Sequence, residues 1–234
     1  MKTRKWISIL CAVCVAAGCS KSAFKREDLA EQIGVKMPVY DESEIRKEFE
    51  KKPNLPNPFK VGVYFKTPAT PKGSVEAWRW TEKDKAFLDD FQADLKAQGV
   101  TAEVFPILHH VVKDEDLRAL RMTAARHHAD ALLVVAGAGE IERGFNNWGW
   151  TYMFILPALV IPASETETLF MTNATLWDVR NEYLYMTAEA EGIVGETHAA
   201  AFGKKDKDLL NEAKSRSLAN LKGELAKMFK STQL

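Results

Sequence analysis

Cys19 is the residue whose type and position point most clearly to covalent chemistry. Ala17 and Gly18 come directly before it, and such small residues let an extended chain enter a peptidase groove. The thiol of Cys19 could then be alkylated with diacylglycerol. Cys11 and Cys14 lie upstream, so a chain cut before Cys19 keeps one cysteine, at its first position. Such a chain forms no internal disulfide.

The residues before Cys19 have the order of an export signal. Met1 to Lys5 is cationic, and the uncharged apolar run from Trp6 to Ala17 is about 12 residues long, whereas a spanning helix needs about 20. The segment resembles the bacterial lipobox, with Ala16 where leucine is common. The resemblance implies that residues 1–18 are removed and that Cys19 carries a lipid anchor. Ser20 after the cysteine implies the outer membrane, facing the periplasm. The alternative is an ordinary signal cut near Ala17.

Charge and composition narrow the function classes. The precursor has 32 basic and 32 acidic residues; removing Lys2, Arg4 and Lys5 leaves 29 basic residues and a net charge near −3. A nucleic-acid partner is therefore not expected. A hydrophobic content of 46% suits one globular domain. We expect a stalk over residues 19–58 and a single domain over residues 59–231.

The expected stalk contains three different patterns. A weak helical pattern joins Phe24, Leu29 and Ile33, and the charge-dense run from Glu42 to Lys52 predicts a solvated helix. The run from Pro53 to Pro58 is stiff and extended, because proline fixes φ and disfavours helix in the residue before it.

The first half of the domain alternates strands and helices, which favours parallel pairing through right-handed crossovers. Pro106 indicates that the second strand lies at an edge, and the third strand, with no polar side chain, is expected at the centre. The predicted elements are a strand at Lys60–Phe65, a helix from a cap at Thr81 to Gln98, a strand at Ala102–Leu108, a helix capped by Asp114, and a strand at Ala131–Ala136.

The second half predicts further strands and one long helix. Glu140 to Phe145 could extend the third strand, and a polar turn from Asp178 to Asn181 joins the last two strands. The sum is an α/β fold of order β-α-β-α-β-β-β-β-α, a mixed sheet with helices packed on it. Its remaining elements are strands at Thr151–Ile161, Thr168–Val179 and Glu182–Gly192, and a helix at Lys205–Lys230 with the stripe Leu218, Leu221, Leu225 and Met228.

Three segments carry a family resemblance. They are Lys60-Val61-Gly62-Val63 after a proline-rich run, the apolar Tyr152–Pro162, and Leu176–Val179 leading into Tyr183–Tyr185 and Gly192. With the lipobox, they resemble rhombotarget-type lipoproteins. More broadly, the element order resembles the amino-terminal domain of the Tol translocation protein, lipoprotein activators of penicillin-binding proteins, and curli secretion subunits. The resemblance brings no catalytic motif, and the families it points to mostly bind partners or have no assigned activity.

Other chemistry-bearing residues favour structural roles. The pairs His109-His110 and His127-His128 cannot each clamp one metal ion, and no H-E-x-x-H or surviving C-x-x-C is present. The glycines of Gly137-Ala138-Gly139 lack the third glycine of a dinucleotide fingerprint. No cofactor or metal is therefore expected.

Glu140 and Glu142 lie two residues apart, so on a strand they share one face. Paired carboxylates serve glycoside hydrolysis, but two on one strand more often form a solvated face. Ser74 and Ser164 lack a nucleophile motif.

The run from Trp148 to Ala163 carries no charge. Either it forms a core strand and a packed loop, or Trp148, Trp150 and Tyr152 form a contact patch for a protein or the membrane interface. Trp78 and Trp80 are further candidates for that patch.

The sequence therefore predicts a non-enzymatic binding or assembly module, lipid-anchored and directed at an envelope protein. One alternative is a subunit of an oligomeric outer-membrane export channel, with the apolar run as a membrane hairpin. The other is a cell-wall glycan hydrolase that uses Glu140 and Glu142.

Overall fold

The computed structural model describes residues 24–34, 41–68, 70, 75–145, 164–198 and 204–232. Their centre is a five-stranded sheet of order β2-β1-β3-β4-β5. β1 pairs in parallel with β2 and β3, whereas β3–β4 and β4–β5 are antiparallel. The expected mixed α/β sheet is confirmed, with β2 at an edge and β3 in the middle. The strands are β1 (Phe59–Phe65), β2 (Thr101–Pro106), β3 (Ala131–Phe145), β4 (Ser164–Asp178) and β5 (Leu184–His198).

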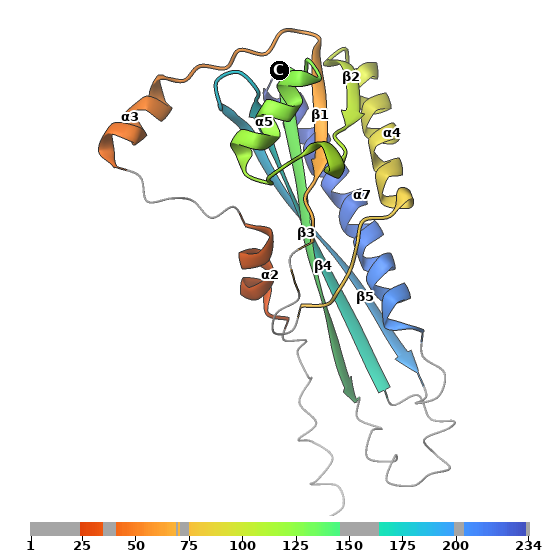
Figure 1. The fold of residues 1–234 in the computed structure, drawn as a ribbon. Coiled ribbons are helices and arrows are strands. Elements are labelled where there is room, and N and C mark those ends of the chain that lie inside the picture. Colours follow the sequence, from red (N-terminus) through yellow and green to blue (C-terminus); the bar gives the residue numbers. More distant parts are fainter. Residues whose placement is uncertain are drawn as a thin grey trace, which may run out of the picture.

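Helices cover both faces of the sheet (Figure 1). On one face, apolar side chains of α4 and α7 join Phe59, Val61 and Val63 in the largest core cluster. On the other face, α5 packs on Tyr64 and Leu132, and α2 packs on β3 and β4. The helices are α2 (Arg26–Ile33), α3 (Glu42–Glu50), α4 (Glu82–Ala97), the short 3-10 helix η1 (His109–Val111), α5 (Leu117–Arg126) and α7 (Asp206–Thr232).

The helix between β1 and β2 begins and ends as predicted. Thr81 and Asp84 form a capping box at the start of α4, which satisfies amides that have no partner within the helix. Gly99 follows the helix with φ +70°, a conformation that glycine adopts at little cost. For α5 the predicted cap was wrong. Asp116 rather than Asp114 is the cap, because its side chain accepts from the Ala119 amide at 2.7 Å.

β3 is one continuous strand through Phe145, which confirms the expected extension. Beyond its pairing with β1 at Ala131–Val135 it continues beside β4, with one isolated antiparallel bridge from Val75 to Glu140 on its other side. β4 and β5 are longer than predicted, 15 residues each, because α2 and α7 bury side chains beyond the part that the apolar pattern marks. The strand expected at Thr151–Ile161 lies outside the described residues.

α7 crosses β5 at very short range. A Cβ at Gly192 would lie 2.1 Å from the Ala213 carbonyl oxygen and 2.5 Å from the Ser217 amide. The stripe of α7 is confirmed at Leu218, Leu221 and Leu225, but Phe229 rather than Met228 is its last buried member.

The segment expected as a stalk contains a docked helix. Phe24, Leu29 and Ile33, the weak pattern noted in the sequence, are all buried against β3 and β4. α3 has no buried residue, as expected of a solvated helix. The chain from Phe24 to Ile33 is thus packed on the sheet instead of extending away from it (Figure 1).

Candidate functional site

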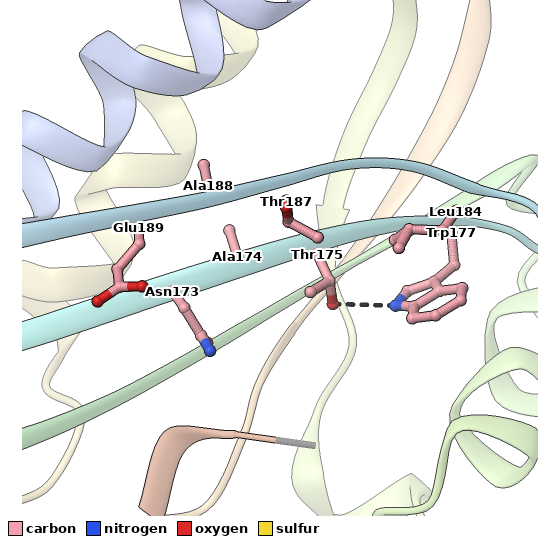
Figure 2. A pocket seen from close by; sticks show the side chains of 8 residues that line it. All are labelled: Asn173, Ala174, Thr175, Trp177, Leu184, Thr187, Ala188 and Glu189. Atoms are coloured by element: carbon pink, nitrogen blue, oxygen red, sulfur yellow. Dashed lines mark hydrogen bonds between the residues drawn. The ribbon is translucent and has the colours of Figure 1, made fainter. Parts of the chain in front are cut away.

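A groove of about 290 Å³ lies on β4 and β5. Thr172 of β4 meets Ser217 of α7 at 2.8 Å, so the alternation of a strand directs Asn173 to the opposite face. The groove therefore opens on the face that carries α2 and α5. Figure 2 shows its lining: Asn173, Ala174, Thr175, Trp177, Leu184, Thr187, Ala188 and Glu189.

One end of the groove is apolar. Trp177 is half-buried and pairs across the ladder with Leu184, which is 38% exposed. The indole Nε1 of Trp177 donates to Thr175 Oγ1 at 2.9 Å, which fixes the ring (Figure 2). An immobilised aromatic ring beside an exposed leucine loses little side-chain entropy when a partner covers it.

The other end of the groove is polar. Asn173 pairs with Glu189, whose side chain is exposed. The Asn173 amide also donates to the Ile33 carbonyl oxygen at 3.2 Å and so caps the last turn of α2. The groove thus runs from an aromatic end to an acidic end, as a surface for an extended segment of a partner.

A second arrangement, here called the α2 clamp, fixes the helix that follows the predicted lipid site. The Lys25 amide donates to Glu140 Oε2 at 2.9 Å, and the Arg26 guanidinium contacts both carboxylate oxygens of Glu191 at 2.9 and 3.1 Å. A carboxylate at a helix N-terminus interacts favourably with the positive end of the helix dipole. Glu140 is 6% exposed, so its expected place on a solvated face was wrong: it accepts a hydrogen bond from the amide of Lys25, the N-cap residue of α2.

A polar cluster joins the end of β1 to the loop before α5. The Tyr64 hydroxyl donates to Glu115 Oε1 at 2.6 Å and lies 3.0 Å from His109 Nδ1. The Thr67 hydroxyl and amide donate to the same oxygen at 2.5 and 3.0 Å. Burial, then the hydrogen bond and negative charge of Glu115, raise the pKa of the Tyr64 hydroxyl.

Two opposing effects act on the pKa of the Glu115 carboxyl. Burial by itself would raise the pKa of its carboxyl, but hydrogen bonds from Thr67 and Tyr64, with the charge of His109, lower it overall. The cluster holds the loop against β1 and leaves Glu115 saturated with donors. We therefore assign it to structure.

The histidine pairs are placed separately. His109 and His110 lie in η1, whereas His127 is the C-cap of α5 and His128 follows with φ 57°. Among the described residues, no three His, Cys, Asp or Glu side chains gather as metal ligands would.

The glycine pair of β3 makes room for an aromatic ring. A Cβ at Gly137 or Gly139 would lie 2.8 Å from Phe170. Trp78 packs edge-on against both Phe170 and Trp80, at 4.8 and 4.6 Å between ring centroids. These residues therefore have packing roles.

Cys19, Trp148, Trp150 and Tyr152 lie outside the described residues, so their predicted roles stay predictions. Sequence reasoning missed Trp177 and Leu184 as surface residues. The sequence offers one indication, an aromatic residue in a strand of alternating polarity. Which face of that strand is buried is decided by the packing of α7, which the sequence of the strand does not show.

No helix in the described part of the chain combines the length and apolarity needed to cross a membrane. No family model matches the chain, and no curated protein matches it.

Solved structures with a similar arrangement include bacterial lipoproteins. One is a minor lipoprotein from Acinetobacter baumannii (11% identity, 77% of this chain and 96% of that one, TM-score 0.37). Another is lipoprotein GNA1162 from Neisseria meningitidis (16%, 74% and 99%, TM-score 0.33). A homolog of the neuraminyllactose-binding hemagglutinin from Helicobacter pylori is also similar (11%, 78% and 94%, TM-score 0.42). At these values the similarities assign no function.

Proposed function

We propose that this protein is a non-enzymatic binding module, held by a lipid on Cys19 at the periplasmic side of the outer membrane. The groove on β4 and β5 is the surface that receives an envelope protein. The observation that carries the proposal is the open stretch of sheet in which Trp177 and Leu184 stand side by side.

In the described part of the chain, α2 contacts the groove at Asn173, and Leu184 of the groove stays exposed. Thr187 and Glu189 are exposed on the same face, while α7 and α4 bury the opposite face. Apolar surface left open between polar residues is a common mark of a protein contact site.

The backbone of β5 adds hydrogen-bonding capacity beside the groove. Asn220 of α7 donates to the Glu191 carbonyl, and Arg216 donates to the Ile193 carbonyl, so these groups point away from β4. By the alternation of an antiparallel ladder, Thr187 and Glu189 direct their backbone groups the same way. An extended partner segment could pair with the backbone of β5 at these two residues.

The site is tested by photo-crosslinking in the native envelope. A benzophenone amino acid replaces Thr187 in the full-length lipidated protein, and a discrete crosslinked band is expected. Leu184→Asp and Trp177→Ala should abolish the band, since they remove the apolar end of the groove.

Met122→Asp is the matched control, because Met122 is an exposed apolar residue of α5 that does not line the groove (55% exposed). It should leave the crosslink unchanged. A crosslink that survives both groove substitutions, or is lost equally in Met122→Asp, would reject the groove as the binding site. Circular dichroism confirms that each variant is folded.

The resemblance to rhombotarget-type lipoproteins fits this role. The contact patch of Trp148, Trp150 and Tyr152 belongs to the same proposal as a second contact. Trp148→Ala and Trp150→Ala together should weaken association with membrane or partner without changing the Thr187 crosslink position.

A further inference from the structure

The α2 clamp fixes where the lipid can be. The Lys25 amide is held by Glu140 of β3, and at the other end of α2 the Ile33 carbonyl is held by Asn173. Asn173 pairs with Ala136, so α2 lies along β3 from the level of residue 140 to that of residue 136. The N-terminus of α2 therefore faces the end of the sheet at Phe145, Ser164 and His198 (Figure 1).

The tether before α2 is short. Phe24 is 8% exposed and belongs to the core cluster beneath α2. Between Cys19 and Phe24 the chain has five residue steps, which span at most about 18 Å when fully extended.

The distance from the N-terminus of α2 to the end of the sheet is nearly the same as the length of this tether. Glu140 is five residues from Phe145, or about 17 Å along a strand. An anchor at Cys19 can extend about as far as the last residues of β3, β4 and β5, and hardly beyond them. The tether is therefore too short to hold the domain away from the bilayer.

We infer that the end of the sheet formed by Phe145, Ser164 and His198 rests against the lipid surface, with the strands pointing away from it. This inference depends on the lipid at Cys19 in the proposed function. Charges near this end are mixed, because Arg143 pairs with Asp206 and Glu76, and Lys204 pairs with Glu212. The tether, not attraction to anionic lipid, then sets the contact.

The same orientation sets the height of the groove. Asn173 pairs with Ala136 and Trp177 pairs with Leu132, nine and thirteen residues from Phe145. These spacings place the groove about 30 to 44 Å above the bilayer, open to a partner in the periplasm.

Depth-dependent fluorescence quenching tests the orientation. Since Cys19 would be blocked by its thioether, and Cys11 and Cys14 would be lost with the signal, an engineered cysteine is the one free thiol. Gly144→Cys marks the membrane end, where a Cβ at this position has no atom within 4 Å. Lys52→Cys marks the opposite end, where the Lys52 carbonyl binds Asn181 in the β4–β5 turn.

Each lipidated variant is labelled with a nitrobenzoxadiazole probe and placed in phosphatidylcholine vesicles that carry a headgroup nitroxide. We expect most of the emission at residue 144 to be quenched and that at residue 52 to be unchanged. Equal quenching at both positions, or stronger quenching at residue 52, overturns the inference.

A longer tether is the decisive second variant. A twelve-residue Gly-Ser insertion after Ser20 leaves the fold unchanged and adds a flexible span of about 19 Å. Quenching at residue 144 should then fall toward that at residue 52, and unchanged quenching would contradict control by the tether. Intact mass separates the two proposals: an unlipidated Cys19 defeats the anchor itself, whereas a lipidated chain with uniform quenching defeats only the orientation.

Discussion

The Lys214 ammonium lies 2.7 Å from Asp84 Oδ2, and both side chains are almost fully buried (1% and 3% exposed). Lys214 also donates to the Arg79 carbonyl at 2.8 Å, and its nitrogen sits 5.7 Å from the centre of the Trp78 ring. The pair joins α7 to the first turn of α4, so the two helices of that face are linked by one interior ion pair.

Lys214→Met leaves the Asp84 carboxylate buried without its cation, and we expect a loss of about 3–5 kcal/mol in the free energy of unfolding. Lys222→Met is the control: Lys222 pairs with Asp90 and Asp94 on the surface, so its loss should cost at most about 1 kcal/mol. Urea denaturation measures both. Equal effects would contradict a specific role for the buried pair.

Leu29→Ala is expected to loosen α2 locally. Leu29 is a fully buried residue of α2 that packs on the sheet. Truncating a buried leucine to alanine costs about 2–5 kcal/mol in the free energy of unfolding. Amide hydrogen exchange over residues 26–33 should therefore accelerate at least about twentyfold, while β3 and β4 keep their protection. Ile45→Ala in α3 should leave the exchange of α2 unchanged. Acceleration spread over the entire sheet would mean that α2 does not open independently.

Gly192→Ala should be strongly destabilising, because its Cβ would meet the backbone of α7 at Ala213 and Ser217. We expect a loss of about 3 kcal/mol or more, the upper range for overpacking. Gly144→Ala has open space around its Cβ and should change stability by no more than about 0.5 kcal/mol. Thermal unfolding of the two variants provides the comparison.

The Glu115 cluster predicts a pH dependence. The folded pKa of the Glu115 carboxyl lies below its ordinary value, because hydrogen bonds from Thr67 and Tyr64, with the charge of His109, outweigh the effect of burial. Its contribution to stability is therefore present above the unfolded pKa near 4.5, and is lost as pH falls through the lower folded pKa.

Thr67→Val removes a hydroxyl donor to Glu115 and should raise this folded pKa, so that the stabilisation is lost at a higher pH. Urea denaturation between pH 3 and 7 follows the change. Glu115→Gln should lack this component altogether, and an identical pH profile in Thr67→Val and wild type would contradict the assignment.

The first half of the fold follows from local signals in the sequence. The valines of β1, the Thr81–Asp84 capping box and Gly99 each act on residues only a few positions away in the chain, so periodicity and capping rules predict α4 and the strands beside it. Pro106 marks the edge strand because it lacks an amide for a second ladder.

The sites depend on contacts between distant residues and could not be predicted in this way. Glu140 reads as a solvated carboxylate until Lys25, 115 positions away, is placed beside it. The groove lies on the face of β4 that α7 does not cover, and the contact of Thr172 with Ser217 of α7 shows which face is covered. The sequence shows that Trp177 alternates with Leu176, but not which of them faces solvent.

The α2 clamp also determines how mechanical load enters the molecule. If Cys19 carries the proposed lipid, tension on its acyl chains would pass to α2 through Phe24 and Lys25 before it reaches the long antiparallel ladder. The contacts of α2 can separate one after another, whereas α7 packs directly against the ladder at Gly192. A pulling force on the proposed anchor would then detach α2 first and leave the strands of the groove in place.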